Sequence, residues 1–274
     1  MKQVVSLQYD VIFKKAFSKP EIFKAFVKAV LGIELEITSV DMEKTFDSKI
    51  GRVKSRFDLF AEDIKKRVIV DIQHMQHEDY YDRFLHYHCM AILEQVKNSK
   101  DYHPKAKVFT IVVLTSENKQ GKDVLTIDFD PKDLQDKGIG KIPHKVIYLC
   151  PAFVNENTPM EYREWLEAIN DTLDGEVDET HYENKIIKQI FDLIEEDSIS
   201  PEERYEMFEE THRLEEIEEG EQKGIGKGQL EKALQIAKGM LAEKLPLDLI
   251  VKLTGLSLSE IEKLGVPLLN DEEK

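Results

Sequence analysis

The sequence is poor in cysteine, and its two cysteines form no recognisable pattern. Cys89 and Cys150 lie far apart among 274 residues, and neither belongs to a CxxC or Cys/His finger spacing. A small disulfide-stapled secreted domain is therefore excluded, and so is a cysteine-based zinc finger. We expect both thiols to be buried and reduced.

The sequence also lacks a long apolar run. Its longest, residues 108–114, is interrupted by Thr110 and is far shorter than the roughly 20 residues of a membrane helix. Residues 1–10 contain no apolar segment of the kind found in signal peptides. We therefore expect a cytoplasmic protein with no membrane partner, long enough for a core domain and a smaller appendage.

Positive charge is scarce over the whole chain, which at first argues against a nucleic-acid partner. The 38 Lys and Arg residues face 54 Asp and Glu residues, for a net charge of -16. Residues 1–107, however, hold 19 basic and 16 acidic residues, a net of +3, which leaves 19 basic and 38 acidic residues, a net of -19, for residues 108–274. Residues 156–222 alone have 24 acidic and five basic residues. We expect a solvated or self-regulating surface there, and a nucleic-acid interface only in the N-terminal part.

Apolar spacing predicts helices followed by strands over the first 151 residues. Two helices are expected at residues 10–17 and 21–31, where apolar residues recur at intervals of three and four. Alternation then predicts strands near residues 37–44, 53–61, 67–73, 107–115, 124–129 and 145–149, with an amphipathic helix near 79–96. This order predicts an α/β fold with a mixed central sheet flanked by helices.

The rest of the chain is predicted to be an all-α tail. Its helices are expected at residues 160–173, 182–195, 201–216, 229–243, 247–254 and 257–264. Four glycines weaken the helix signal in the middle of the tail and predict a flexible joint: Gly220, Gly224, Gly226 and Gly228. The predicted organisation is a core at residues 1–151, an acidic helical region at 152–219, a Gly-rich joint at 220–228 and a C-terminal helical segment at 229–274.

Two of the predicted apolar strands are each interrupted by a carboxylate, Asp58 in one and Asp71 in the next. A turn centred between Ile64 and Lys65 pairs residues whose numbers sum to 129, which places Asp58 opposite Asp71 on one sheet face. Paired β-carbons lie about 4.5–5.5 Å apart, and two carboxylates at that separation repel unless a cation lies between them. The spacing therefore predicts a divalent-cation site.

Mg²⁺ is the expected ion, with Mn²⁺ as an alternative, because it prefers hard oxygen ligands and keeps several waters. Gln73, two residues after Asp71, points to the same face and can reach a bound water. Such a metal acidifies water for attack on phosphorus and neutralises charge on the phosphate oxygens, as phosphodiester hydrolysis requires. The other interpretation, which the pattern alone favours, is that Asp58 and Asp71 are solvent-facing residues of edge strands.

Basic residues near this pair indicate how a phosphate backbone would be held. Three of them alternate with apolar residues on the strand that leads to the first aspartate: Arg52, Lys54 and Arg56. On the amphipathic helix, Arg83 lies at helical spacings from Tyr80 and Tyr87 and is the expected phosphate contact there. The two tyrosines either line a groove for DNA or simply pack.

Several segments resemble the Rpn family of recombination-promoting nucleases, also described as transposases, which belongs to the PD-(D/E)XK nuclease superfamily. The resemblance rests on Tyr9 to Phe17, Arg56-Phe57-Asp58, Asp71-Ile72-Gln73 and Tyr80 to Phe84. In the tail, residues 219–228 and 236–257 are similar to the family's Gly-rich joint and terminal helices. The resemblance covers most of the chain and implies a restriction-endonuclease-like core and hydrolase activity on DNA.

Carried over by residue, the resemblance implies that Asp58 and Asp71 are metal ligands and catalytic residues. Gln73 stands where the superfamily's lysine usually lies, and Asp10 on the first helix would be an outer acid. The chain departs from the commoner family form in having Asp71 where glutamate is usual, and Gln73 carries no positive charge. Slow or partner-dependent cleavage is therefore expected.

The leading hypothesis is a magnesium-dependent DNA endonuclease of low sequence specificity, acting in DNA recombination, mobile-element movement or defence. The alternative is a catalytically weak nuclease fold that serves as a DNA-binding or protein-interaction module. A third interpretation has residues 156–222 mimicking DNA and covering the basic core until they are displaced. Whether the protein is a homodimer is open at this stage.

Three weaker signals do not change these hypotheses. A group of histidines within fifteen residues lacks HExxH spacing and is not expected to bind zinc: His74, His77, His86 and His88. The glycine cluster lacks the GxxxxGK[ST] pattern of a phosphate loop. Residues 247–264 resemble half of a helix-turn-helix DNA reader, but their acidic flanks favour protein contact.

Overall fold

A computed structural model describes residues 1–46, 55–74, 80–96 and 103–265 of the chain. The chain divides into two compact units, Met1–Glu210 and Thr211–Lys274. No helix in the described ranges combines the length and the apolar character that a membrane crossing needs.

A mixed six-stranded sheet forms the centre of the first unit. Its strands, in the order in which they lie side by side, are β2 (Asp41–Phe46), β3 (Ser55–Glu62), β4 (Lys66–Gln73), β5 (Lys107–Leu114), β7 (Lys145–Leu149) and β6 (Val124–Asp128). The pairs β2–β3, β3–β4 and β6–β7 are antiparallel, whereas β4–β5 and β5–β7 are parallel. The predicted α/β class with a mixed sheet is confirmed.

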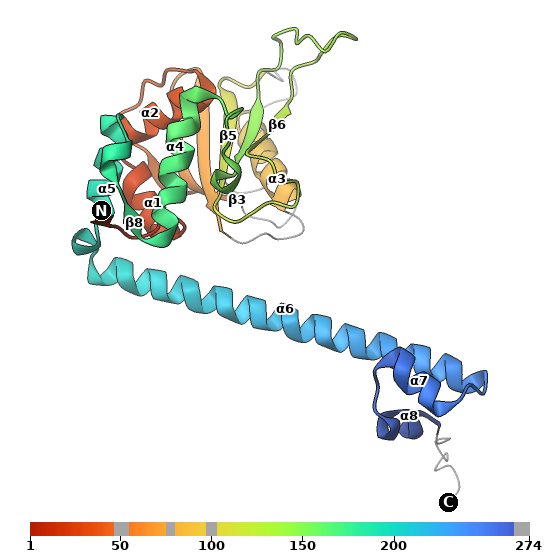
Figure 1. Cartoon of the computed structure of the whole chain (residues 1–274). Helices are drawn as coiled ribbons and strands as arrows, with labels where there is room; N and C mark the ends of the chain where they lie inside the picture. The colour runs from red at the N-terminus through yellow and green to blue at the C-terminus, as the bar shows by residue number, and fades with distance from the viewer. Residues whose placement is uncertain (47–54, 75–79, 97–102, 266–274) are drawn as a thin grey trace, which may run out of the picture. The chain divides into compact units, whose positions relative to one another are not determined.

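Helices cover both faces of this sheet (Figure 1). On one face lie α1 (Asp10–Phe17), α2 (Pro20–Leu31), α4 (Met160–Asp171) and α5 (Lys185–Leu193), whose apolar residues share the main core with the sheet. The other face carries α3 (Tyr80–Leu93), which crosses over between the parallel strands β4 and β5 and fills two smaller clusters. Both faces are buried, which explains why β4 and β5 are almost continuously apolar.

The segment after Pro151 contributes to the main core of the first unit. Trp165 of α4 lies 6.3 Å from the ring of Phe17 and 5.3 Å from that of Phe26, between ring centroids. The segment also contains a strand, β8 (Glu176–Val177), which pairs with β1 (Lys2–Gln3). The expectation of helix alone after Pro151 is therefore wrong in this detail, because a two-residue strand leaves no alternation to read.

The remaining short elements of the first unit are single turns of 3-10 helix. They are η1 (Pro151–Phe153), η2 (Thr172–Asp174), η3 (Glu179–His181) and η4 (Glu196–Ser198).

A single long helix, α6 (Pro201–Ala242), replaces the two shorter helices that we predicted there. The predicted break at Gly220, Gly224, Gly226 and Gly228 is wrong, since the helix runs through all four. Glycine costs at most about 1 kcal/mol relative to alanine in a helix, so it lowers helix stability without forbidding the conformation. The domain limits given above stay a prediction.

The second unit has a small core of its own. It contains α6 from Thr211 onward, then α7 (Leu247–Thr254) and α8 (Leu258–Gly265). Its fully packed residues are Ala237, Ile250, Leu256 and Ile261. Gly255 ends α7 with φ of 71°, in the left-handed conformation that glycine adopts at least cost.

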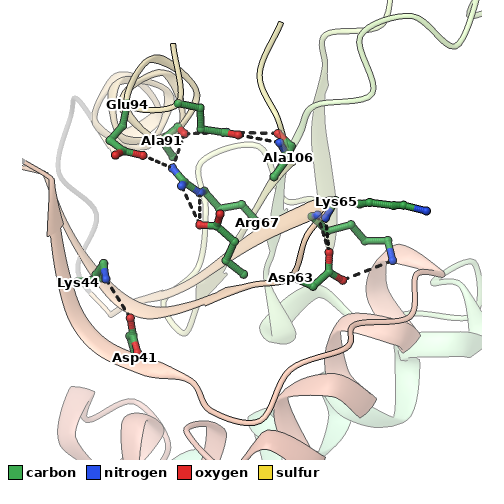
Figure 2. Close-up of polar contacts among 11 residues, drawn as sticks. Asp41, Lys44, Asp63, Lys65, Arg67, Ala91, Glu94 and Ala106 are labelled. Carbon is green, nitrogen blue, oxygen red and sulfur yellow. Dashed lines mark hydrogen bonds and ion pairs between the residues drawn. The ribbon is translucent and has the colours of Figure 1, made fainter. Parts of the chain in front are cut away.

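Arg67 connects β4 to α3 (Figure 2). Its guanidinium donates to Glu62 at 2.9 Å, to Glu94 at 3.1 Å and to the Ala91 carbonyl at 2.8 Å. It also lies over the ring of Phe46, 5.1 Å from the centroid. The residue is 5% exposed, so its charge is held by this network and not by water.

We expect Arg67→Met to lower the free energy of unfolding by about 2 kcal/mol, since it removes charge-assisted hydrogen bonds and leaves their acceptors without this donor. The matched control is Lys44→Met, because the Lys44–Asp41 pair in the same view is exposed and such pairs contribute about 0–1 kcal/mol. Urea denaturation of the two variants measures the difference. Equal losses would contradict a structural role for the Arg67 network.

Candidate active site

The hairpin between β3 and β4 has the predicted register. Asp63 accepts from the backbone N–H groups of Lys65 and Lys66, both at 2.7 Å, and its own N–H donates to the Lys66 carbonyl. Leu59 pairs with Val70 and the remaining pairs follow the same sum of 129. Asp58 and Asp71 are the next residues along this ladder.

At these two aspartates, hydrogen bonds from backbone N–H groups to the carboxylates replace the backbone–backbone hydrogen bonds of the strand pair. The Asp58 N–H donates to Oδ1 of Asp71 at 3.2 Å, and the Ile72 N–H donates to Oδ2 of Asp58 at 3.0 Å. Each carboxylate therefore accepts from the opposite strand, as a backbone carbonyl would. The exchange holds both carboxylates in place without help from a ligand.

Burial and neighbouring charge make this pair reluctant to ionise. Burial raises the pKa of the Asp58 carboxyl to about 6, the carboxylate of Asp10 adds to the rise, and the ammonium of Lys14 opposes it. Asp71 is 1% exposed. Its burial and the charge of Asp58 raise the pKa of Asp71 well above the ordinary value.

Two carboxylate oxygens in the site are buried without a hydrogen-bond donor in the described parts of the chain: Asp71 Oδ2 and Asp10 Oδ1. A buried acceptor without a donor is costly. A proton or a cation would satisfy each of them. The donor set therefore fits a hard cation held by carboxylate oxygen.

The site suits an ion that takes few of its ligands from the protein. Among the residues that the structure describes, no group of three or more His, Cys, Asp and Glu side chains is arranged to hold a metal. Mg²⁺ often takes only one or two carboxylates and completes its shell with water and substrate oxygens. Asp58 and Asp71 meet that smaller requirement.

Lys14 of α1 lies among three carboxylates. Its Nζ is 2.6 Å from Asp10 Oδ2, 3.2 Å from Glu43 Oε1 and 3.8 Å from Asp58 Oδ1. Burial lowers the pKa of Lys14, but the carboxylates of Asp58 and Asp10 raise it by more, so its pKa lies above the ordinary value. Lys14 is therefore a buried, permanent positive charge beside Asp58.

Glu43 reaches this cluster through an unusual backbone conformation. Its φ is 56°, which non-glycine residues rarely adopt. It lies between two regular pairs of the β2–β3 ladder, Met42 with Leu59 and Lys44 with Phe57. Strained residues of this kind cluster at functional sites, and here the strained residue binds Lys14.

Gln73, the last residue of β4, and Arg83 of α3 contact each other next to the two aspartates. Arg83 of α3 donates from Nη1 to the Gln73 side-chain oxygen at 3.2 Å, and its charge opposes the rise in the pKa of both aspartates. The predicted neighbours of Arg83 take the packing alternative. Tyr80 is 5% exposed, and Tyr87 packs edge-on against Phe57.

The predicted basic strand face is described only in part. Arg56 is exposed and forms an ion pair with Glu43, which places it at the edge of the cluster. Arg52 and Lys54 lie outside the described residues. The role of all three in binding nucleic acid stays a prediction.

Two of the four histidines singled out in the sequence make hydrogen bonds within the fold, and His86 is exposed. His74 bonds to Thr115 at 3.0 Å and His88 to Thr110 at 2.9 Å. Burial lowers the pKa of His88 to about 3, so its ring is neutral. His77 lies outside the described residues.

Two residues of the site, Lys14 and Glu43, were not predicted from the sequence. Lys14 was detectable, because it lies four residues after Asp10 and such residues share one face of a helix. No local signal marks Glu43, whose left-handed conformation usually selects glycine or asparagine.

Comparison with known protein families assigns both parts of the chain. Residues 7–216 match the family described as PD-(D/E)XK nuclease family transposase. Residues 230–266 match the C-terminal HTH domain of the Rpn/YhgA-like nuclease family. No curated protein and no solved structure is similar enough to be matched.

Proposed function

Because this chain belongs to the PD-(D/E)XK nuclease transposase family, we propose that it is a metal-dependent endonuclease that hydrolyses phosphodiester bonds in DNA with low sequence specificity. The observation that carries the proposal is the pair of aspartates, the half-buried Asp58 and the buried Asp71, each of which accepts a hydrogen bond from the opposite strand. Two carboxylates this close repel each other when both are ionised, so the pair is costly unless a proton or a cation neutralises it. Recombination, mobile-element movement or defence are the settings proposed for this activity.

Each residue of the site has a proposed part. Asp58 and Asp71 hold the ion, which is Mg²⁺ or Mn²⁺, and Gln73 orients a water or a phosphate oxygen. Asp10, on α1, is an outer acid next to Asp58. Arg83 holds a backbone phosphate next to Gln73. A bound divalent ion would lower the pKa of its water and neutralise charge on the phosphate.

The C-terminal unit supports a nucleic-acid partner. It matches an HTH domain family, and such domains place a helix in the major groove. This match runs against our earlier preference for protein contact by residues 247–264. We propose that the second unit helps to bind DNA, and that the acidic region between regulates access; a homodimer stays a prediction.

Cleavage of supercoiled plasmid in the presence of Mg²⁺ or Mn²⁺ tests the proposed function. We expect nicking by the purified protein, none after addition of EDTA, and a loss of about 1000-fold in rate for Asp58→Asn, which corresponds to about 4 kcal/mol of transition-state stabilisation. Asp128→Asn is the matched control, because that aspartate pairs with Lys145 on β6 and β7. Equal nicking by all three proteins would refute the proposal.

The alternative, a binding module with a weak nuclease fold, is favoured by the uncharged Gln73 and by the lack, among the described residues, of three or more side chains arranged to hold a metal. Isothermal calorimetry separates it from the enzyme. A pure binding module takes up DNA without Mg²⁺, whereas the enzyme binds Mg²⁺ and loses that binding in Asp58→Asn.

A further inference from the structure

The proposed nuclease site lacks a positive charge at the position where the superfamily usually has lysine. Gln73 occupies that position, and an amide can orient a phosphate oxygen but cannot neutralise it. Arg83 is close, but its guanidinium is bonded to Gln73 and lies over the rings of Phe84 and Tyr87, with centroids at 5.1 and 5.5 Å. Since Arg83 is already assigned to a backbone phosphate beside Gln73, a cation for the reacting phosphate near Asp58 would come from elsewhere in the fold.

Lys14, on α1, lies next to Asp58. Its ammonium is 3.8 Å from Oδ1 of Asp58, the oxygen opposite to the one that accepts from Ile72. The side chain of Lys14 is only 8% exposed. A lysine of that burial is rare unless it is paired, and this one is paired with residues of the proposed site.

The surroundings of Lys14 are built to hold an ammonium at this place. The ammonium donates a hydrogen bond to Asp10, one turn earlier on α1, and another to Glu43 on β2. Glu43 does so from a left-handed backbone, φ 56°, which costs about 1–3 kcal/mol. The same carboxylate also pairs with the exposed Arg56, so the strained backbone places one acceptor between a buried and an exposed cation; strained residues of this kind cluster at functional sites.

We propose that Lys14 is the catalytic cation of this site, whose ammonium contacts the phosphate group undergoing hydrolysis and supplies the positive charge that Gln73 cannot. The proposal rests on the nuclease activity proposed above. In that hydrolysis the water oxygen bonds to phosphorus and the bond to the leaving sugar oxygen breaks. One water proton ends on the leaving oxygen and the other on the new phosphate. Negative charge builds on the phosphate oxygens in between, and Lys14 stabilises it.

Lys14→Met keeps an unbranched side chain, without the terminal ammonium, and so removes the charge. We expect kcat for plasmid cleavage to fall roughly 100- to 1000-fold with little change in KM, because the lost contact is made in the transition state. The matched control is Lys15→Met. Lys15 is the next residue of α1 and pairs with Glu203 at 2.8 Å on another side of the helix, so its loss leaves kcat unchanged.

A lysine placed at the superfamily's usual position tests whether the charge of Lys14 can be replaced. In the double variant Lys14→Met/Gln73→Lys, the new lysine stands on β4, two residues after Asp71. We expect the kcat of this double variant to be at least tenfold higher than that of Lys14→Met. A merely structural Lys14 would not be rescued from a different strand. Failure of the rescue, with both proteins folded, would overturn the proposal.

Metal binding gives a readout that does not depend on cleavage. Calorimetry with Mn²⁺ should show that Lys14→Met binds the ion as tightly as the wild type or several-fold more tightly, because a competing positive charge near Asp58 has gone. Weaker Mn²⁺ binding in Lys14→Met would mean that Lys14 only positions Asp58, and would overturn the assignment. A wild-type protein that nicks no plasmid would refute the proposed function, whereas an active Lys14→Met would refute only the part assigned to Lys14.

Discussion

Asp71→Asn is expected to abolish plasmid cleavage and, at the same time, to make the metal-free protein more stable at high pH. Asparagine keeps Oδ1, the atom that accepts from the Asp58 N–H, so the strand contact survives. The variant loses the negative charge that would bind a cation, and we expect a fall in rate of roughly 1000-fold. Removal of an unpaired buried charge stabilises the fold by about 1–3 kcal/mol.

The sign of the pH dependence follows from the raised pKa of Asp71. Burial and the charge of Asp58 raise this pKa, so the folded state binds the proton more tightly than the unfolded chain does. Stability that comes from such a group is present at low pH and is lost as the pH rises through the folded pKa. Asp71→Asn has no proton to lose. The difference in melting temperature between variant and wild type should therefore grow from pH 5 to pH 9.

Thermal unfolding in EDTA across that range measures the effect, and roughly 2–4 °C per kcal/mol is expected for a unit of this size. Asp128→Asn again serves as the control, because its loss of an ion pair with Lys145 should give no gain at pH 9. An Asp71→Asn protein that melts below the wild type at pH 9 would contradict the proposed electrostatic conflict. Addition of Mn²⁺ should reverse the order, since only the wild type gains stability from the ion.

The part of the site that could be predicted from the sequence is the part fixed by a short turn. Asp58 and Asp71 are thirteen residues apart, and the position of the turn at Asp63 determines which residues pair. Alternation and turn position are local properties, so the register followed from the sequence. The contact between Gln73 and Arg83 was not predicted, because the angle at which α3 crosses the sheet is not encoded locally.

The residues missed by the sequence analysis depend on tertiary structure. Glu43 reaches Lys14 only because β2 lies beside β3 and because its own backbone is left-handed. Neither condition leaves a mark on the residues around it. The glycines of α6 show the opposite error: their low helix propensity is a real but small free energy, and a helix of 42 residues continues through them.

The packing of α4 and α5 into the main core could not be predicted from local sequence patterns either. The apolar faces of α4 and α5 were visible as helical periodicity, but periodicity does not say what a face packs against. In the structure they pack on α1 and α2, in the same core as the sheet. The first unit should therefore fold by itself only when α4 and α5 are present.

A protein ending at Pro151 is expected not to fold, whereas one comprising residues 1–216 should melt as cooperatively as the full chain. The shorter protein lacks four side chains that bury the outer surface of α1 and α2: Trp165, Ile169, Ile187 and Phe191. Truncating one large core side chain typically costs about 3–5 kcal/mol. Loss of several therefore exceeds the roughly 5–15 kcal/mol by which a domain is stable.

The two truncations differ in what they leave exposed. Phe17 and Phe26 are fully buried in the complete unit, and in the shorter protein both would face water beside the sheet. Residues 1–216 keep this core and also keep Glu210, whose side chain accepts from the Asp10 N–H at the start of α1. Near-ultraviolet circular dichroism and thermal unfolding distinguish them. A cooperative transition in residues 1–151, with a melting temperature near that of residues 1–216, would show that the sheet with α1, α2 and α3 is a complete domain, as the sequence alone had predicted.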